Sequence, residues 1–421
     1  MRACVWEACP SPYEKTAASR HVYEDGIRVR ETDGYLESAD QTSLGADNGV
    51  ALAYMMDLMD QEDPGLPDLE FLITVGEEEG LRGVKDLGLS GFRGDFLINL
   101  DAEEEGVFFT SCAGGARARL VLPIRYEKQS GEIRVLLKVE GLRGGHSGLE
   151  IGLGRANAAQ VLGRVLCRTE EIARVGRISF PGKANAIAAR GEAEFYLPED
   201  ALSLFRSRIA DLEEELRREY EETDAVSLTL QAAKGDFAGC FVYSREVVRA
   251  LGGLLALLPC GALRWADRAA GMVESSANIG AVTEEEGALV VLCSARSSLG
   301  SRKEAIKEQM RLAARFAGAQ CEFFGEYPQW EYRSESRLRE ICAKTYRERS
   351  GKEAVFTGIH AGLECGYLAQ KMGGQADMIS FGATLREVHT PREQMDLASF
   401  YRTRGFLRAV LLRLAKEPVL R

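Results

Sequence analysis

The sequence predicts an α/β fold in which one domain is split by an inserted α+β domain. Up to Gly114, short apolar runs alternate with a helical segment, which is typical of an open sheet with helices. Longer alternating strands and charged amphipathic helices follow, and the first pattern returns after Tyr327. At 421 residues the chain also exceeds one ordinary hydrophobic core, which favours two domains.

The first part contains three predicted elements. Residues 48–60 have a helical pattern, and residues 69–75 and 96–100 are apolar runs with the length of buried strands. Open α/β sheets bind ligands beyond the carboxyl ends of their strands. Polar side chains that follow these runs are therefore candidates for a functional site.

The middle and last parts contain longer elements. We predict strands at residues 133–139, 192–196 and 288–295, and helices at residues 156–167, 201–222, 303–317, 334–349 and 397–415. We therefore expect one domain built from residues 1–114 and 326–421, and an inserted domain at residues 115–325.

The composition is that of a folded, acidic protein. Hydrophobic residues make up 45% and charged residues 28% of the chain, which is typical of a globular protein. The net charge of −11 argues against nucleic acid or an anionic membrane as the main partner, because both require a basic surface. No apolar stretch approaches the roughly 20 residues that span a bilayer, and no signal peptide is evident.

The ten cysteines are scattered and contain no CxxC pair. In a long acidic chain without a signal peptide, this pattern indicates reduced thiols in a cytoplasm. Cys112, Cys293 and Cys365 lie in apolar or glycine-rich surroundings, so we expect them to be small buried residues.

Carboxylates and one imidazole occur where predicted elements begin or end. The positions are Asp47 before the first helix, Glu77 and Glu78 after residues 71–75, Asp101 after residues 96–100, and His389 after residues 378–381. Of two adjacent carboxylates at a strand end, one can hold a metal while the other takes a proton from metal-bound water. Acidic and imidazole ligands of this kind suit zinc or manganese.

Each position also has a simpler interpretation when it is taken alone. Glu77 would belong to a solvated acidic turn, Asp101 to a charged loop, and His389 would be a structural or solvent-facing histidine. Asp47 alone favours an N-cap of the following helix, a role that aspartate performs well. The occurrence of all of them at element ends, in this order, favours a site.

The segment 144–148 places glycines on both sides of His146 and Ser147. This arrangement suits a backbone that closely approaches a ligand, and it suits a turn equally well. We do not expect Ser147 to be a nucleophile, because no Gly-x-Ser-x-Gly elbow surrounds it.

Together these segments resemble the zinc-dependent dipeptidases of the aminoacylase and carboxypeptidase G superfamily. The resemblance is greatest to the aminoacyl-histidine dipeptidases, a subfamily also called peptidase D or cytosol non-specific dipeptidases. It extends from about residue 14 to the C-terminus, and it is carried by residues 43–49, 74–80, 97–106, 112–115, 141–148, 359–366 and 381–394. It implies a split zinc-peptidase-like catalytic domain, an inserted lid and dimerisation domain, and a homodimer.

The resemblance implies a metal-binding role for four residues and a catalytic role for a fifth. Asp47 would bridge two metals, Glu78 and His389 would bind one of them, and Asp101 would bind the other. Glu77 would be the general base that accepts a proton from metal-activated water. Zinc is the implied metal, with manganese or cobalt as alternatives.

The resemblance also assigns residues of the inserted domain to the substrate. His146 matches a lid histidine that reaches across the dimer to stabilise the oxyanion. Asn185 and Arg296 match lid positions that grip the terminal carboxylate, for which the forked donors of arginine are well suited. The implied activity is hydrolysis of unblocked dipeptides, including those with histidine at the C-terminal position.

The sequence departs from the family at one motif. The family has His-x-Asp at the end of an early strand, and the corresponding positions fall near Ala8 and Pro10. We expect a dipeptidase that lacks its N-terminal part. One of its two metal sites would therefore be incomplete. Two alternatives stay open: a protein that genuinely holds one metal, and Cys9 as a replacement ligand. His21 is not assumed to replace the missing histidine, because it belongs to a stretch that resembles a surface loop of the family.

Two other functions stay open. One is an amidase of the same superfamily that acts on N-acylated amino acids. The other is a weakly active or inactive dipeptidase-like protein that binds peptides, which the missing His-x-Asp motif would explain.

Overall fold

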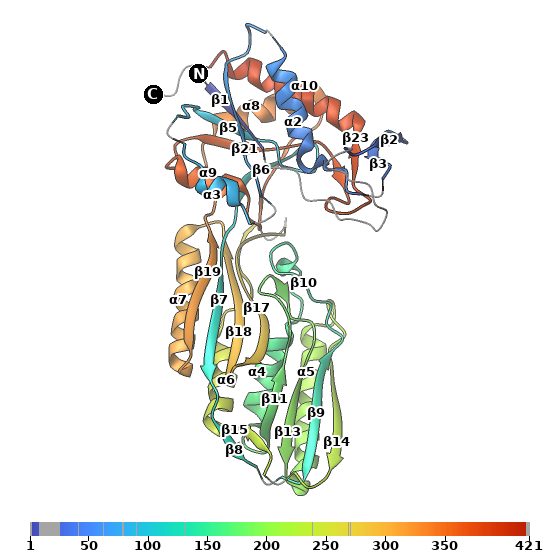
Figure 1. Ribbon diagram of the computed structural model, residues 1–421, viewed down its shortest axis with the longest axis vertical. Helices are drawn as coiled ribbons and strands as arrows, with labels where there is room; N and C mark the ends of the chain where they lie inside the picture. Colours follow the sequence, from blue (N-terminus) through green and yellow to red (C-terminus); the bar gives the residue numbers. More distant parts are fainter. Residues whose placement is uncertain are drawn as a thin grey trace. The chain divides into compact units, whose positions relative to one another are not determined.

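A computed structural model describes residues 2–7, 26–40, 42–61, 63–77, 80–89, 91–129, 131–237, 239–267, 269 and 271–417. The chain forms two compact units. We call residues 1–112 with 328–421 the split unit, and residues 113–327 the inserted unit (Figure 1). The α/β architecture predicted from the sequence is confirmed, because each unit combines sheets with covering helices.

The split unit contains a six-stranded sheet. Its strands lie in the order β20 (Val355–Ile359), β6 (Val107–Cys112), β21 (Asp377–Ser380), β5 (Phe96–Asn99), β1 (Arg2–Glu7) and β4 (Asp68–Ile73). Neighbouring strands are parallel except for β21 and β6. Strand β21, from the end of the chain, therefore separates β5 and β6, which are consecutive in the sequence.

Five helices and a small sheet complete the described part of the split unit. The helices are α2 (Ala46–Met59), α3 (Arg82–Asp86), α8 (Arg337–Ser350), α9 (Glu364–Lys371) and α10 (Leu397–Leu414). The small antiparallel sheet contains β2 (Val29–Thr32), β3 (Tyr35–Ser38), β23 (Gln394–Asp396) and β22 (Leu385–Arg386).

An aromatic cluster joins the two sequence segments of the split unit. The ring centroid of Phe108 on β6 lies 5.5 Å from those of both Phe381 and Phe406, and 5.7 Å from that of Tyr346. Aromatic pairs at such distances stabilise a core beyond the burial of their area. The core thus ties residues before the insertion to residues after it.

The inserted unit contains two larger antiparallel sheets. One has five strands in the order β16 (Gly261–Asp267), β17 (Met272–Glu285), β18 (Ala288–Ser297), β7 (Gly114–Pro123) and β19 (Gln320–Tyr327). The other has four strands in the order β11 (Arg174–Ser179), β13 (Gly191–Leu197), β9 (Ile133–Glu140) and β14 (Ser227–Lys234). Two short pairs are β10 (Gly145–His146) with β12 (Ala186–Ile187), and β8 (Tyr126–Lys128) with β15 (Phe241–Tyr243).

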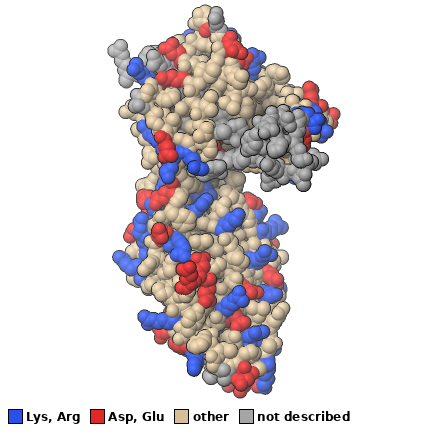
Figure 2. Space-filling view, in the orientation of Figure 1, with Lys and Arg blue, Asp and Glu red and all other residues tan. Residues whose placement is uncertain are grey.

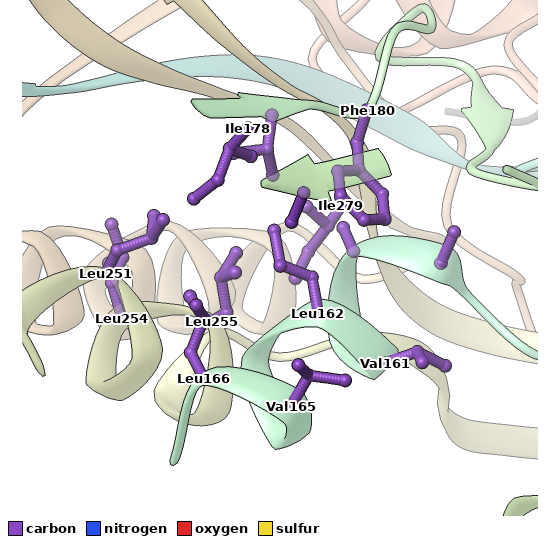
Figure 3. Close-up of a cluster of buried hydrophobic side chains, with 14 of the residues drawn as sticks. Val161, Leu162, Val165, Leu166, Ile178, Phe180, Leu251, Leu254, Leu255 and Ile279 are labelled. Carbon is purple, nitrogen blue, oxygen red and sulfur yellow. The ribbon is translucent and has the colours of Figure 1, made fainter. Parts of the chain in front are cut away.

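The described residues of the inserted unit include the helices α4 (Ala158–Thr169), α5 (Leu202–Glu219), α6 (Arg245–Leu257) and α7 (Gly300–Ala317). Helix α4 begins two residues later than predicted because Asn157 caps it, with Oδ1 accepting the amide hydrogens of Ala159 and Gln160. Apolar side chains of α4, α6 and the sheets then pack together, among them Val161, Leu162, Val165, Leu166, Ile178, Phe180, Leu251, Leu254, Leu255 and Ile279 (Figure 3). Full burial of one such side chain contributes roughly 1.5–3 kcal/mol.

The surface and the cysteines agree with a folded acidic protein. On the face shown in Figure 2, Lys and Arg side chains are interspersed with Asp and Glu side chains. Cys112, Cys293 and Cys365 are buried, as predicted, and burial raises the pKa of the Cys112 thiol to about 11. Within the described residues, no helix is both long and apolar enough to cross a bilayer.

Candidate active site

The described site residues of the split unit lie at one edge of its sheet. Strands β4, β1, β5 and β21 run parallel, so their carboxyl ends meet there. Asp101 follows β5, and Glu77 follows β4 in a turn where its carbonyl oxygen accepts the amide hydrogens of Gly80 (3.0 Å) and Leu81 (2.7 Å). Glu78, like the early positions Ala8, Cys9, Pro10 and His21, lies outside the described residues.

Asp47 and His389 meet at this edge. The Nε2 atom of His389 lies 2.8 Å from Oδ2 of Asp47, and the Asp47 side chain is mostly buried. Asp47 has non-helical backbone angles (φ −91°, ψ 98°), and its peptide bond to Asn48 is cis. Its carboxylate therefore faces a histidine, and the N-cap interpretation of Asp47 is wrong, since α2 starts from Gly45 without a side-chain cap hydrogen bond.

Asn48 connects this region to Asp101. Its Nδ2 donates to the carbonyl oxygen of Leu100 (2.8 Å) and to Oδ1 of Asp101 (3.0 Å). Its Oδ1 accepts the amide hydrogen of Ala51 at 3.2 Å, as the cap of a helix does. Asn48 was not predicted as a site residue, because an asparagine between aspartate and glycine has the pattern of an ordinary turn.

Glu393 makes a second connection that sequence analysis missed. Its carboxylate accepts the amide hydrogens of Gly45 (2.8 Å), Ala46 (2.8 Å) and Asp47 (3.1 Å), and the residue is 2% exposed. The only sequence signal was its place inside the matching stretch at residues 381–394.

The carboxylates of this edge are close enough to perturb one another. Burial raises the pKa of Asp101 well above its usual range, and the negative charges of Asp47, Glu77 and Glu364 add to this rise. The hydrogen bond from Asn48 acts in the opposite direction. A cluster of this kind favours either a shared proton or a bound cation over free carboxylates.

Glu364 is the third residue that sequence analysis missed. It is the first residue of α9 and is 0% exposed, and its two carboxylate oxygens lie 3.0 and 2.9 Å from Oγ1 of Thr74. A single charge in the apolar stretch 361–369 was the available signal, because such a residue is rarely buried without a polar role.

The side chains at this edge of the sheet are chemically suited to bind a divalent cation. Asp47, Asp101, Glu77 and Glu364 supply carboxylates and His389 supplies an imidazole, which is a ligand set of zinc or manganese sites. Among the residues that the structure describes, however, no group of three or more His, Cys, Asp or Glu side chains is arranged so that it could hold a metal ion. The cluster thus has suitable donors without a preformed cage in its described part.

The candidate residues of the inserted unit are also near one another. Nδ1 of His146 accepts the amide hydrogens of Gly148 (3.3 Å) and Leu149 (3.1 Å). Burial lowers the pKa of His146, and the charge of Arg296 adds to this effect against a smaller opposite effect of Glu150. Both the lowered pKa and the two hydrogen bonds to Nδ1 favour the neutral ring with its proton on Nε2, the form that offers one N–H donor to a ligand.

One nitrogen of the Arg296 guanidinium group makes a hydrogen bond within the inserted unit. Its Nη1 donates to the hydroxyl oxygen of Tyr327 at 2.7 Å, the residue is 9% exposed, and its buried Nε has no hydrogen-bond partner among the described residues. Asn185 is partly buried, and its carbonyl oxygen accepts the amide hydrogen of Ser147 at 2.9 Å. Ser147 itself is buried.

Comparison with known proteins gives consistent matches. The sequence model of Peptidase family M20/M25/M40 matches residues 45–413. The chain is 34% identical over 390 residues to the cytosol non-specific dipeptidase of Escherichia coli K12, which covers 91% of this chain and 79% of that protein.

The fold also matches those of solved structures. The crystal structure of aminoacylhistidine dipeptidase from Vibrio alginolyticus matches with a TM-score of 0.89 and 27% identity, over 99% of this chain and 85% of that one. Aminopeptidase PepT from Bacillus cereus ATCC 10987 matches with a TM-score of 0.56 and 16% identity, over 99% and 81% of the two chains, which is a likeness of fold alone.

Proposed function

Because this chain belongs to Peptidase family M20/M25/M40, we propose that it is a metal-dependent dipeptidase that hydrolyses unblocked dipeptides, including those with C-terminal histidine. The relatives named as a non-specific dipeptidase and an aminoacylhistidine dipeptidase support this substrate class. The observation that carries the proposal is the clustering of Asp47, Asp101 and His389 with Glu77 at one sheet edge.

Asp47, Asp101 and His389, together with Glu78, would hold the metal, which we propose to be zinc, with manganese or cobalt as alternatives. When bound, such a cation lowers the pKa of water towards about 7 and polarises the substrate carbonyl. The raised pKa of Asp101 supports this assignment, because a nearby positive charge would offset the repulsion among the carboxylates.

The protein side chains move the proton and hold the substrate. Glu77 takes the proton of the attacking water on a carboxylate oxygen and delivers it to the nitrogen of the leaving amine. The Nε2–H of neutral His146 donates to the oxygen that gains negative charge. Arg296 and Asn185 bind the terminal carboxylate, a role for which the forked donors of arginine are well suited.

We also propose a homodimer that forms through the inserted unit, with His146 serving the partner copy. Small peptides are the only substrates in this proposal, with no nucleic acid or membrane as a partner. A cytoplasmic location is supported by the cytosolic relative and by free thiols in the described part of the chain.

Two observations favour a second function. The described donors form no ready metal cage, and the sequence has no His-x-Asp motif near residues 8–10, so a peptide-binding protein without turnover is the alternative.

The test uses the full chain. Its metal content is measured by mass spectrometry, and hydrolysis of glycyl-histidine and β-alanyl-histidine is compared with that of N-acetyl-histidine and other N-acylated amino acids, with and without added zinc or manganese. Metal-dependent cleavage of the free dipeptides is expected. Cleavage of N-acylated substrates alone would indicate an amidase, and calorimetric binding of dipeptides without turnover would indicate the peptide-binding function.

A further inference from the structure

We propose that Glu393 is a positioning residue that locks the backbone carrying Asp47 to the loop carrying His389, and thereby sets the spacing of these two side chains. The proposal deepens the proposed function, because it rests on Asp47 and His389 being metal ligands. Glu393 itself would touch neither metal nor substrate.

The first observation is the set of contacts made by the carboxylate. Oε2 of Glu393 accepts the amide hydrogen of Gly45, and Oε1 accepts those of Ala46 and Asp47. These amides lie at the irregular start of α2, where Asp47 and Asn48 have non-helical backbone angles, and Gly45 at the cap position has no side chain to accept them. A carboxylate group from a distant segment of the sequence accepts all three amide hydrogens instead.

The second observation is that Glu393 and His389 belong to one compact loop between β22 and β23. The amide of Glu393 donates to the carbonyl oxygen of Thr390 (3.1 Å), and Oγ1 of Thr390 donates to that of Glu387 (2.7 Å). His389 has a φ of 63° and Glu387 a φ of 50°, a left-handed conformation that surrounding contacts must hold in place.

Together these contacts show how Glu393 could position Asp47 relative to His389. One end of a tight loop carries His389, and the other end grips three consecutive amides whose last residue is Asp47. Because 342 positions separate His389 from Asp47, no local chain geometry fixes their distance. Loss of the grip would let the Asp47 segment move relative to the loop, and thus relative to His389.

The chain offers a matched control in Asp377. This carboxylate is 4% exposed and satisfies the start of a helix in the same unit, accepting hydrogen bonds from Oγ of Ser336 (2.6 Å) and the amide of Leu338 (2.9 Å). It is the first residue of β21, paired with Phe96 at the start of β5. It therefore lies at the sheet edge opposite to the site, and Asp377→Asn reports the cost of losing a buried capping carboxylate alone.

The first experiment needs no metal. The chain contains four histidines, so nitrogen-15 spectra of labelled histidine side chains in the metal-free protein are simple, and His389→Gln identifies the His389 signals. Glu393→Gln places an amide NH2 group against at least one backbone donor, so it should shift the His389 signals. Asp377→Asn should leave them in place. Unchanged His389 signals in folded Glu393→Gln would refute the positioning role, whatever the metal chemistry is.

The second experiment measures zinc affinity by competition with a chromogenic chelator, and records the visible spectrum of the cobalt-substituted protein. We expect affinity to fall about tenfold or more in Glu393→Gln, as for other residues that orient metal ligands. The drop should be smaller in Glu393→Asp, which keeps the charge, and absent in Asp377→Asn. If Glu393→Gln does not fold, Glu393→Asp carries both measurements.

Different results would refute the proposed function and the positioning role of Glu393. If the unmodified chain binds neither zinc nor cobalt, the proposed function fails, while the histidine spectra still decide the positioning role. If the unmodified chain binds metal and Glu393→Gln and Glu393→Asp bind it equally well, the positioning role fails and the proposed function stands.

Discussion

His389 contacts Asp47 through atoms 2.8 Å apart, although 342 positions separate the two residues in the sequence. Asp47 lies in the segment before the insertion and His389 in the segment after it. The relationship therefore depends on the complete split unit. It also links His389 to the group of carboxylates whose charges act on Asp101, because Asp47 belongs to that group.

Replacement of Glu77 tests the general base. Glu77→Gln should lower kcat by about a hundredfold or more, because a positioned acid–base group contributes at least that much, while KM and zinc content stay near wild type. Steady-state kinetics on glycyl-histidine and metal analysis measure both. Glu104→Gln removes an exposed carboxylate nearby and should leave kcat unchanged. A loss of less than tenfold in Glu77→Gln would exclude Glu77 as the base.

Asp101→Asn separates stability from metal binding. Asp101 is crowded by the charges of Asp47, Glu77 and Glu364, so removing its charge should not lower the Tm of the metal-free chain. The same change removes a proposed ligand, and zinc affinity should fall by about tenfold or more. Calorimetry of metal-free protein and chelator competition report the two effects.

Asp86→Asn is the charge-matched control for this variant, because Asp86 is exposed on the short helix α3. It should change neither quantity. A clear loss of Tm in metal-free Asp101→Asn, with zinc affinity retained, would contradict the assignment of Asp101 as a ligand.

Arg296→Lys tests recognition of the substrate carboxylate. Lysine keeps the charge but lacks the planar fork, so KM for a free dipeptide should rise by about tenfold, on the scale of one charged hydrogen bond. For a dipeptide amide, which has no terminal carboxylate, the variant and the wild type should be equally poor. Arg264→Lys, on the same sheet but paired with Glu274 at 2.8 Å, should leave both values unchanged.

Mixing two inactive variants tests the dimer. Glu77→Ala keeps His146, and His146→Ala keeps Glu77. If His146 serves the partner copy, random exchange of subunits should restore about a quarter of the wild-type sites, because half of the dimers are mixed and each has one intact site. Activity after mixing, with sedimentation to show the dimer, measures this. No recovery in a mixture shown to contain mixed dimers would place His146 in the site of its own copy.

The sequence predicted the strands best where apolar runs were short and bounded. β5 and β9 lie within one residue of their predicted ranges. β17 was not predicted, because its Met272–Glu285 segment contains serines, an asparagine and a glycine and does not alternate. The position of β21 between β5 and β6 was also beyond prediction, since no local pattern reports which distant strand fills a gap in a sheet.

Part of the candidate site could be predicted, because its polar residues lie at the ends of predicted strands and helices. Asp47 and His389 were both identified, but the sequence favoured a cap for Asp47 when it was taken alone. The structure assigns capping contacts to Asn48 and Glu393 instead. Glu393 follows a proline and an arginine in a charged stretch, where nothing in the sequence distinguishes a buried carboxylate from a solvated one.

The place of β21 in the sheet has a consequence for how the chain is synthesised. β5 and β6 leave the ribosome with no strand to fill the place between them, and residues 113–327 must be made before β21 follows. At 5–20 residues per second, synthesis of the residues between β6 and β21 takes about 13–53 s. The strands of the inserted unit pair with one another once they are made, whereas β5 and β6 of the nascent chain expose unpaired strand edges, which are prone to aggregation.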